Sequence, residues 1–269
     1  MESCIGIASS GATLRAEVRG QGPAVILLHA GVADRRMWQS TQSSLAKTYR
    51  TIAYDRRGFG ETLTPDEPFS HAGDLDRVIT HFNCQRPILI GCSQGGRIAI
   101  DYTLAHPGKV AALVLVATAV SGAPQPPAHP PAIAALLTGL DSAEEAGDLE
   151  RVNAIEARLW LDGPQAKENR IAGEARQLFL DMNAKALRHP RLTMEQPSPS
   201  AIGQLQLIDV PTLVIWGDLD FPHIQQRSQW LATVMPGARS HIMPGCAHLP
   251  SLEQPERFNS AVSDFLATC

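Results

Sequence analysis

The sequence has little excess charge and no long hydrophobic run. Lys and Arg number 23 against 27 Asp and Glu, which gives a formal net charge of −4, with a pI near 6.1. A chain without a basic surface is a poor partner for the nucleic-acid backbone. The longest apolar run, residues 110–120, is interrupted by Thr118 and is too short to span a bilayer. We therefore expect no nucleic-acid partner and no membrane span.

Cysteine is also sparse, and its five positions form no recognisable pattern. The number is odd and the spacings match no metal site, so we expect free thiols in a reducing compartment. The first four residues lack the basic start and apolar run of a signal peptide, so a cytoplasmic location is expected. No H-E-x-x-H motif occurs, and residues 20–22 (G-Q-G) precede a strand where a dinucleotide loop would follow one. We therefore expect no metal and no cofactor. The cysteines are Cys4, Cys84, Cys92, Cys246 and Cys269.

The most informative stretch is residues 91–95 (G-C-S-Q-G), which has the form G-x-S-x-G. Residues 87–90 precede it as a buried strand, and residues 97–106 follow as a helix. A strand that turns sharply into a helix with serine at the apex is a nucleophile elbow. The apex backbone is strained, and only very small residues fit two positions before and after it. The turn places the Ser93 hydroxyl where free backbone N–H groups at a helix start stabilise a developing oxyanion.

Apolar runs elsewhere predict further buried strands, as in a parallel sheet that is covered on both faces. Helical patterns fall between these runs. The alternation predicts an α/β fold with a mostly parallel, doubly wound sheet. The expected strands are residues 13–18, 24–28, 51–54, 87–90, 110–117, 211–216 and 239–243, and the expected helices are residues 37–49, 73–83, 97–106, 225–234 and 255–267.

The alternation breaks at a proline-rich connector, residues 123–131. The signals that follow are helical, and Ser142 with Glu145 suggests a capping box. A helical block inserted between strands is expected to cover the carboxyl edge of the sheet, where open α/β sheets bind ligands. A surface insertion without a part in catalysis is the alternative. We predict an α/β core domain of residues 1–122 and 208–269, with a helical cap of residues 123–207.

Three residue types needed for acyl transfer come after predicted strands. Ser93 is the first, either Asp218 or Asp220 is the second, and His248 is the third. A serine hydroxyl is a weak nucleophile that needs a neutral imidazole to take its proton. The imidazole in turn needs a carboxylate that fixes its tautomer and stabilises its charged form. The chain order Ser, Asp, His is the one expected of this kind of fold.

Together these segments resemble the α/β-hydrolase superfamily over nearly the whole chain. The resemblance implies a mostly parallel sheet with a helical cap and a triad of Ser93, Asp220 and His248, because the family acid is the fourth residue of G-x-x-D. The matching segments are residues 27–31 (L-L-H-A-G), 55–60 (D-R-R-G-F-G), 91–96 (G-C-S-Q-G-G), 217–220 (G-D-L-D) and 247–250 (A-H-L-P).

The resemblance also implies an oxyanion hole. Its donors are the backbone N–H groups of Gln94 and Gly31, with Val32 as the alternative register to Gly31. Ala30 stands where the family usually has Gly. The cap is expected to supply a mostly apolar pocket. Trp160 is a candidate for its lining, and burial of Trp160 inside the cap is the alternative.

Comparison within the superfamily narrows the expected chemistry. Ser93 separates the chain from haloalkane dehalogenases and epoxide hydrolases, which use Asp as the nucleophile. Leu249 follows His248 where C–C hydrolases typically carry Trp, and residues 248–256 are similar to carboxylesterases and enol-lactonases. We expect hydrolysis of a small, largely apolar carboxylic ester or lactone through an acyl-enzyme. The alternatives are C–C hydrolysis or perhydrolysis by the same triad, and a ligand receptor on a retained hydrolase fold. The sequence sets no oligomeric state.

Overall fold

The computed structural model describes residues 3–126 and 128–269, and within them the chain is built on an eight-stranded sheet. The strand order is β1-β2-β4-β3-β5-β6-β7-β8. β2 lies antiparallel to β1 and β4, whereas the other neighbouring strands run parallel. The predicted α/β fold with a mostly parallel sheet is confirmed. The strands are β1 (Ser3–Ser9), β2 (Ala12–Arg19), β3 (Ala24–Leu28), β4 (Arg50–Tyr54), β5 (Ile88–Cys92), β6 (Ala112–Val116), β7 (Thr212–Gly217) and β8 (Arg239–Met243).

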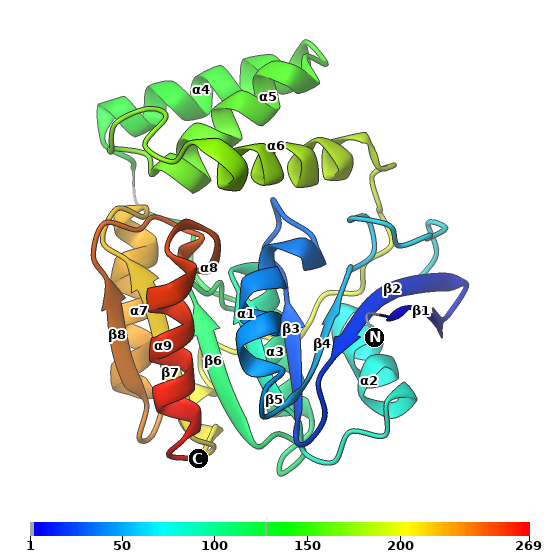
Figure 1. Ribbon diagram of the computed structural model, residues 1–269. Helices are drawn as coiled ribbons and strands as arrows, with labels where there is room; N and C mark the ends of the chain where they lie inside the picture. Colours follow the sequence, from blue (N-terminus) through cyan, green and yellow to red (C-terminus); the bar gives the residue numbers. More distant parts are fainter. Residues whose placement is uncertain (1–2, 127) are drawn as a thin grey trace.

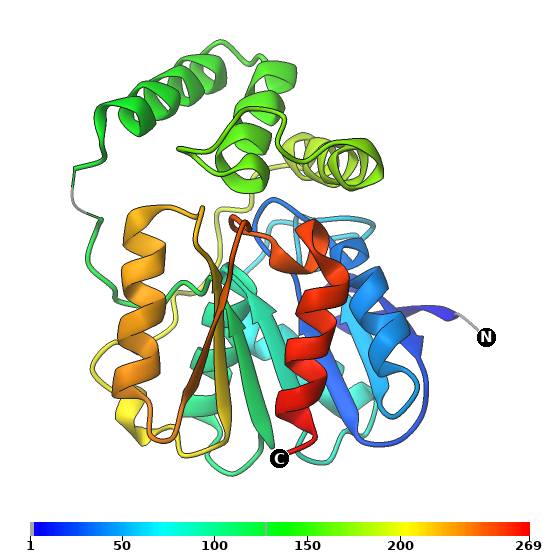
Figure 2. The same cartoon turned by 60° about the vertical axis from the view of Figure 1, so that its left-hand side comes forward.

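Helices cover both faces of the sheet (Figures 1 and 2). Alternate residues of a strand point to opposite faces, so Ile26 and Leu28 of β3 join one core cluster and Val25 and Leu27 join the other. Both faces of the sheet are buried under helices, which is why the central strands are apolar throughout. On the first face lie α2 (His71–His81), α3 (Gln94–Ala105) and α7 (Pro222–Val234), and on the second lie α1 (Gln39–Leu45), α8 (Pro250–Glu253) and α9 (Pro255–Leu266).

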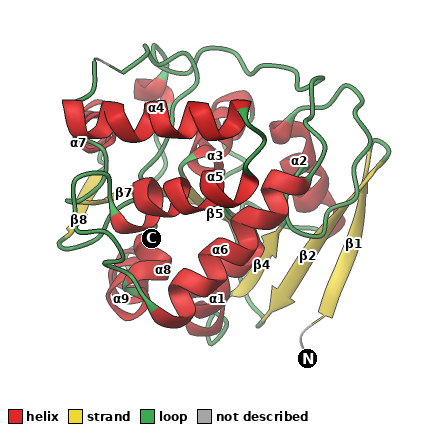
Figure 3. Cartoon of the chain, turned by 90° about the horizontal axis from the view of Figure 1, so that it is seen from above, coloured by secondary structure: helices red, strands yellow, loops and turns green. Residues whose placement is uncertain are grey.

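Three further helices form a layer above the carboxyl edge of the sheet, as Figures 1 and 3 show. They are α4 (Pro131–Glu145), α5 (Leu149–Glu156) and α6 (Gly173–Arg188), and η2 (Ala157–Asp162) continues α5 as a π-helical turn. We call residues 131–188 the helical block. The chain enters it after β6 and reaches β7 after leaving it. Residues 189–207, which include η3 (Leu205–Leu207), then run back along the sheet, with Ala201 and Leu205 in the core. The division of the chain at residues 123 and 207 stays a prediction.

Two local predictions differ from the structure. Ser142 lies inside α4 and donates its hydroxyl to the Thr138 carbonyl (2.9 Å), a bond that serines within helices commonly make, so the capping box with Glu145 is wrong. Asp148 caps α5 instead, by accepting a hydrogen bond from the Arg151 N–H (3.1 Å). The helix expected over residues 37–49 is also shorter, because η1 (Arg35–Trp38) begins it as a 3-10 turn and α1 ends at Leu45.

The described residues also bear on the expectations about membrane spans and cysteines. Among the helices of the described residues, none is long and apolar enough to cross a membrane. All five cysteines are free, and Cys84, Cys92 and Cys246 are buried. Met1 and Glu2, at the start considered for a signal peptide, and Pro127, in the proline-rich connector, lie outside the described residues.

Candidate active site

Ser93 stands at the sharp turn between β5 and α3. Its backbone has φ 53° and ψ −113°, a conformation that residues with a Cβ rarely adopt. Its N–H donates to the Val116 carbonyl (2.8 Å) and its own carbonyl accepts from the Ala119 N–H (3.1 Å), so the chain around β6 holds the strained residue. A Cβ at Gly91 would lie 2.4 Å from the Gly95 carbonyl oxygen, which explains the small residue there. The structure therefore has the backbone of an elbow at this motif.

His248 and Asp220 meet at the carboxyl ends of β8 and β7. The His248 Nδ1 lies 2.7 Å from Asp220 Oδ2, and both residues are 2% exposed. The other oxygen of Asp220 accepts from the Phe221 N–H (2.7 Å), which fixes the carboxylate. Asp218 is exposed and accepts from the Gly245 N–H (2.7 Å) instead. Of the two carboxylates that the sequence offered, the structure brings Asp220 to the imidazole.

Ser93 and His248 line one cavity of about 240 Å³, which we call the Ser93 pocket. The predicted oxyanion and pocket residues are gathered around it, and Asp220 lies behind His248. Within the described residues, no group of three or more His, Cys, Asp or Glu side chains is placed to hold a metal ion. The lining residues are Gly31, Val32, Ser93, Gln94, Glu156, Trp160 and His248.

Trp160 lies in the pocket wall and also touches the imidazole. Its ring centroid is 4.7 Å from that of His248 and 4.8 Å from that of Phe221, and its carbonyl accepts the His248 backbone N–H (3.3 Å). It belongs to η2, and such π-helical turns occur frequently at functional sites. Both sequence interpretations of Trp160 thus apply in part, since the side chain lines the pocket and is partly buried.

Glu156 is a pocket residue that the sequence interpretation missed. Its Oε2 accepts from Asn183 Nδ2 (2.6 Å), and its Oε1 has no hydrogen-bond partner in the described part of the chain. Burial raises the pKa of this carboxyl above its usual range. Glu156 and Gln94 make the pocket more polar than the mostly apolar pocket expected from the sequence. The sequence did contain a signal for Glu156. It precedes Trp160, a residue already expected to line the pocket, by four positions and therefore lies on the same helix face.

The two residues expected to supply the oxyanion donors are in contact. Gln94 is the first residue of α3, so its N–H has no partner within the helix. Gly31 follows β3, and its N–H has no acceptor among the described residues. A methyl group at Gly31 would lie 3.0 Å from the side-chain amide of Gln94, so these two residues are closely packed. Ala30 does not have a positive φ, which explains why a side chain is accommodated where the family usually has Gly.

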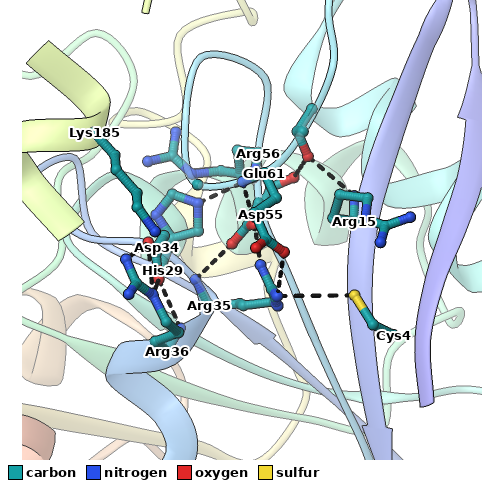
Figure 4. A network of polar contacts seen from close by, with 12 residues as sticks. Cys4, Arg15, His29, Asp34, Arg35, Arg36, Asp55, Arg56, Glu61 and Lys185 are labelled. Carbon is teal, nitrogen blue, oxygen red and sulfur yellow. Dashed lines mark hydrogen bonds and ion pairs between the residues drawn. The ribbon is translucent and has the colours of Figure 1, made fainter. Parts of the chain in front are cut away.

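A network of ion pairs supports the loops behind the pocket, and Figure 4 shows the part around Arg35. Arg35 pairs with Asp55 and with Glu61, the latter at 2.6 Å. Arg57 pairs with Asp74 (2.9 Å), and both of these side chains are buried. Removal of the carboxylate from the Arg35–Asp55 or the Arg57–Asp74 pair leaves an uncompensated buried charge, which costs about 3–5 kcal/mol of stability. These residues therefore tie loops together.

Comparison with known proteins agrees with this fold. The sequence model of the Alpha/beta hydrolase family matches residues 25–261, which is most of the chain. The chain is 29% identical over 262 residues to 2-hydroxymuconate semialdehyde hydrolase of Pseudomonas sp. (strain CF600), covering 92% of this chain and 88% of that protein.

Two relatives named as esterases are similarly close. The pimeloyl-[acyl-carrier protein] methyl ester esterase of Edwardsiella ictaluri (strain 93-146) is 27% identical over 242 residues, which cover 90% of this chain and 92% of that protein. The crystal structure of the esterase RhEst1 from Rhodococcus sp. ECU1013 superposes with a TM-score of 0.78 at 26% identity, covering 99% of this chain and 98% of that one.

Proposed function

The chain belongs to the alpha/beta hydrolase family, and from this premise we propose that it is a serine hydrolase that cleaves a small carboxylic ester or lactone through an acyl-enzyme on Ser93. The observation that carries the proposal is the Ser93 pocket. One cavity of about 240 Å³ is lined by the elbow serine, by the imidazole that contacts a buried carboxylate, and by two residues whose N–H groups have no acceptor in the described part of the chain. This set of groups supplies what acyl transfer requires.

The geometry supports a definite assignment of roles. Because His248 Nδ1 contacts the Asp220 carboxylate, that nitrogen carries the proton and Nε2 is left to accept one. Ser93 attacks the substrate carbonyl while His248 Nε2 takes the hydroxyl proton. The N–H groups of Gly31 and Gln94 hold the oxyanion. His248 then protonates the leaving alcohol, and water activated by His248 releases the acid from Ser93.

The helical block is proposed to act as a cap that selects the substrate. Glu156 and Trp160 belong to it and line the same cavity as Ser93. A carboxylate with one free oxygen favours a substrate that carries a hydroxyl or protonated amine, since either group can donate a hydrogen bond to Oε1. The proposed substrate is therefore a small ester or lactone with a polar donor group, and not the largely apolar molecule expected from the sequence.

C–C hydrolysis remains the second candidate, because 2-hydroxymuconate semialdehyde hydrolase is among the relatives with 29% identity. The same triad and the same oxyanion hole would serve it. A ligand receptor on a retained fold would instead cleave its ligand very slowly or only once per protein molecule. Substrate class and turnover number therefore separate the three possibilities.

The decisive experiment combines labelling with turnover. A fluorophosphonate probe is expected to add once, on Ser93, and Ser93→Ala is expected to abolish both the labelling and the hydrolysis. A panel of substrates then identifies the reaction. It contains p-nitrophenyl esters of increasing chain length, simple lactones and a vinylogous 1,5-diketone, the class of compound whose C–C bond a C–C hydrolase would cleave. Labelling that survives Ser93→Ala, or ester cleavage limited to one turnover, contradicts the proposal.

A further inference from the structure

Arg56 differs from the other arginines of the network behind the pocket. It is 1% exposed, like Arg57, yet in the described part of the chain no carboxylate lies within ion-pair distance of its guanidinium group. Arg35 and Arg57 both have buried acidic partners. A buried charge without a partner costs stability, so its presence calls for a reason other than folding.

Both hydrogen bonds of the Arg56 guanidinium go to the expected oxyanion hole. Nη2 donates to the Ala30 carbonyl (3.2 Å), and Nη1 donates to the Gln94 side-chain oxygen (3.1 Å). The Ala30 carbonyl belongs to the same peptide group as the Gly31 N–H. Arg56 therefore touches the peptide unit that offers one oxyanion donor and the side chain of the residue that offers the other.

His29 donates a second hydrogen bond to the same Ala30 carbonyl. The Arg56 backbone N–H, which can only donate, lies 3.0 Å from His29 Nε2, so Nε2 accepts and the proton sits on Nδ1. The protonated Nδ1 lies 2.7 Å from the Ala30 carbonyl and donates to it. Burial lowers the pKa of His29 well below its ordinary value, which agrees with a neutral ring. Figure 4 shows His29 beside Arg56.

From this geometry we propose that Arg56 is a positioning residue for the reaction, which polarises the Ala30–Gly31 peptide and orients Gln94 so that the oxyanion hole binds developing negative charge more strongly. Hydrogen bonds in a chain strengthen one another, so donors on a carbonyl make the N–H of the same peptide a better donor. The inference rests on the proposed function, because it assigns Arg56 to the hole next to Ser93.

The charge state of Arg56 fits this role. Burial lowers its pKa to about 10, so the side chain still carries its positive charge at neutral pH. The guanidinium carbon lies 4.5 Å from the centre of the Phe59 ring, a favourable cation–π contact that replaces part of the lost hydration. Because Arg56 is almost fully buried, its cation acts on the expected oxyanion donors at a lower effective dielectric than in water and needs no rearrangement.

Arg56 also decides which way the Gln94 amide points. A guanidinium offers only donors, so Gln94 must present its oxygen to Arg56. The amide NH2 group is then turned away from Arg56, and the side chain packs against Gly31. Loss of Arg56 frees this amide to rotate, and its oxygen could then face the oxyanion, where it would repel negative charge.

The test compares Arg56→Met and Arg56→Lys with the wild type. Loss of one direct oxyanion donor costs about 10²–10³ in kcat, so loss of a residue that acts through the donors is expected to cost about 10–100-fold, with KM changed less than about threefold. Arg56→Lys keeps the charge and is expected to recover part of the loss. The melting temperature of Arg56→Met is expected not to fall, because the substitution removes an unpaired buried cation and leaves the Ala30 carbonyl bonded to His29.

A tetrahedral inhibitor separates this role from a structural one. An alkyl trifluoromethyl ketone adds to the active serine and places a negative oxygen in the oxyanion hole. Its affinity for Arg56→Met is expected to fall by the same factor as kcat. This measurement needs adduct formation on Ser93 but no ester turnover, so it decides on Arg56 even if the proposed substrate class is wrong. Failure of the wild type to bind the ketone or a fluorophosphonate would instead count against the proposed function itself.

Arg57 supplies the matched control. It is equally buried, but it donates to Asp74 and to the Ser9 carbonyl (2.6 Å), away from the pocket. Arg57→Met is expected to lower the melting temperature and to change kcat by less than about threefold. Should this variant not fold, Arg57→Lys takes its place. The inference is overturned if Arg56→Met keeps its kcat and ketone affinity, or if Arg56→Met and Arg57→Met lose both equally and in step with stability.

Discussion

The two sides of the Ser93 pocket are built in different ways. On the sheet side, Asp220 and His248 are almost fully buried, and the backbone of Ser93 is held by neighbouring chain on both its N–H and its carbonyl. On the side of the helical block, Glu156 and Trp160 are only partly buried, and Glu156 keeps one oxygen without a hydrogen-bond partner in the described residues. The first side can fix reacting atoms in place, whereas the second can meet a variable part of a substrate.

This difference follows from where each side lies in the chain. The sheet side comes from the ends of β3, β5, β7 and β8, whose apolar runs are anchored in two core clusters. The block side comes from one insertion between β6 and β7. An insertion can change in sequence without moving the strand ends, so a division into fixed chemistry and adjustable selection is the expected outcome. Variants on the two sides should therefore fail in different ways.

The largest effect is expected on the sheet side, from Asp220→Asn. Loss of the carboxylate leaves the imidazole in the wrong tautomer, so kcat should fall by about 10²–10⁴. Asp218→Asn is the matched control two residues away, and it should cost less than about tenfold, because the Asp218 carboxylate accepts only from the Gly245 N–H in the described residues. Steady-state kinetics decide between them once circular dichroism shows that both variants are folded. Greater damage from Asp218→Asn would mean that the acid is assigned to the wrong residue.

The pH dependence should also belong to the sheet side. His248 accepts the Ser93 proton only when its imidazole is neutral, so kcat/KM should fall on acidification, approaching about tenfold per pH unit once most of the imidazole is protonated. The profile is measured with an uncharged ester. Glu150→Gln should leave the position of this fall unchanged for that ester, since Glu150 is exposed and does not line the pocket. A rate that stays flat on acidification would indicate a different base.

The contrast between the two sides also shows where sequence reasoning succeeds. The apolar runs predicted β3, β5, β6 and β7 because a strand buried on both faces leaves a local signal. β1 was missed, although Ser10 and Gly11 have the positive φ angles of a two-residue hairpin turn and an S-G pair marks such a turn. Its pairing with β2 depends on a partner strand, which a run of residues does not reveal by itself.

Contacts between distant residues explain what else was missed. Arg56 and Gln94 are 38 positions apart, and Glu156 and Asn183 are 27 apart, so neither pair leaves a periodic signal. The choice of Asp220 over Asp218 came from the family resemblance, because the direction of two loop carboxylates depends on the turn at Gly217. Motifs thus located the reacting groups, while the residues that orient and select required the fold.

On the block side, Trp160 should change substrate preference. Trp160→Phe keeps an aromatic ring near His248 but shortens the wall, so esters with longer acyl chains should gain relative to acetate by roughly fourfold to fifteenfold, the effect of burying one or two further methylenes at about 0.8 kcal/mol each. Trp160→Ala should add a general loss of kcat, because it removes the ring that packs on His248. Rates along a p-nitrophenyl ester series test both. Equal losses for every ester in Trp160→Phe would point to a structural role alone.

The smallest effect is expected from Glu156, and it tests the block side most directly. Glu156 accepts from Asn183 on one oxygen and offers the other to the pocket, so the wild type should prefer an ester whose acyl chain ends in a protonated amine over the alkyl ester of equal length, and should disfavour one that ends in a carboxylate. The group is only partly buried and solvent screens its charge, so Glu156→Gln should lower the amine preference by only about threefold to tenfold.

Glu150→Gln is the matched control, because Glu150 lies on α5 but is exposed and does not line the pocket. The ratio of kcat/KM values for the three esters is the measurement. If the two Gln variants shift this ratio equally, surface charge alone explains the preference, and if the wild type favours the carboxylate ester, selection by the helical block has been assigned to the wrong side chain.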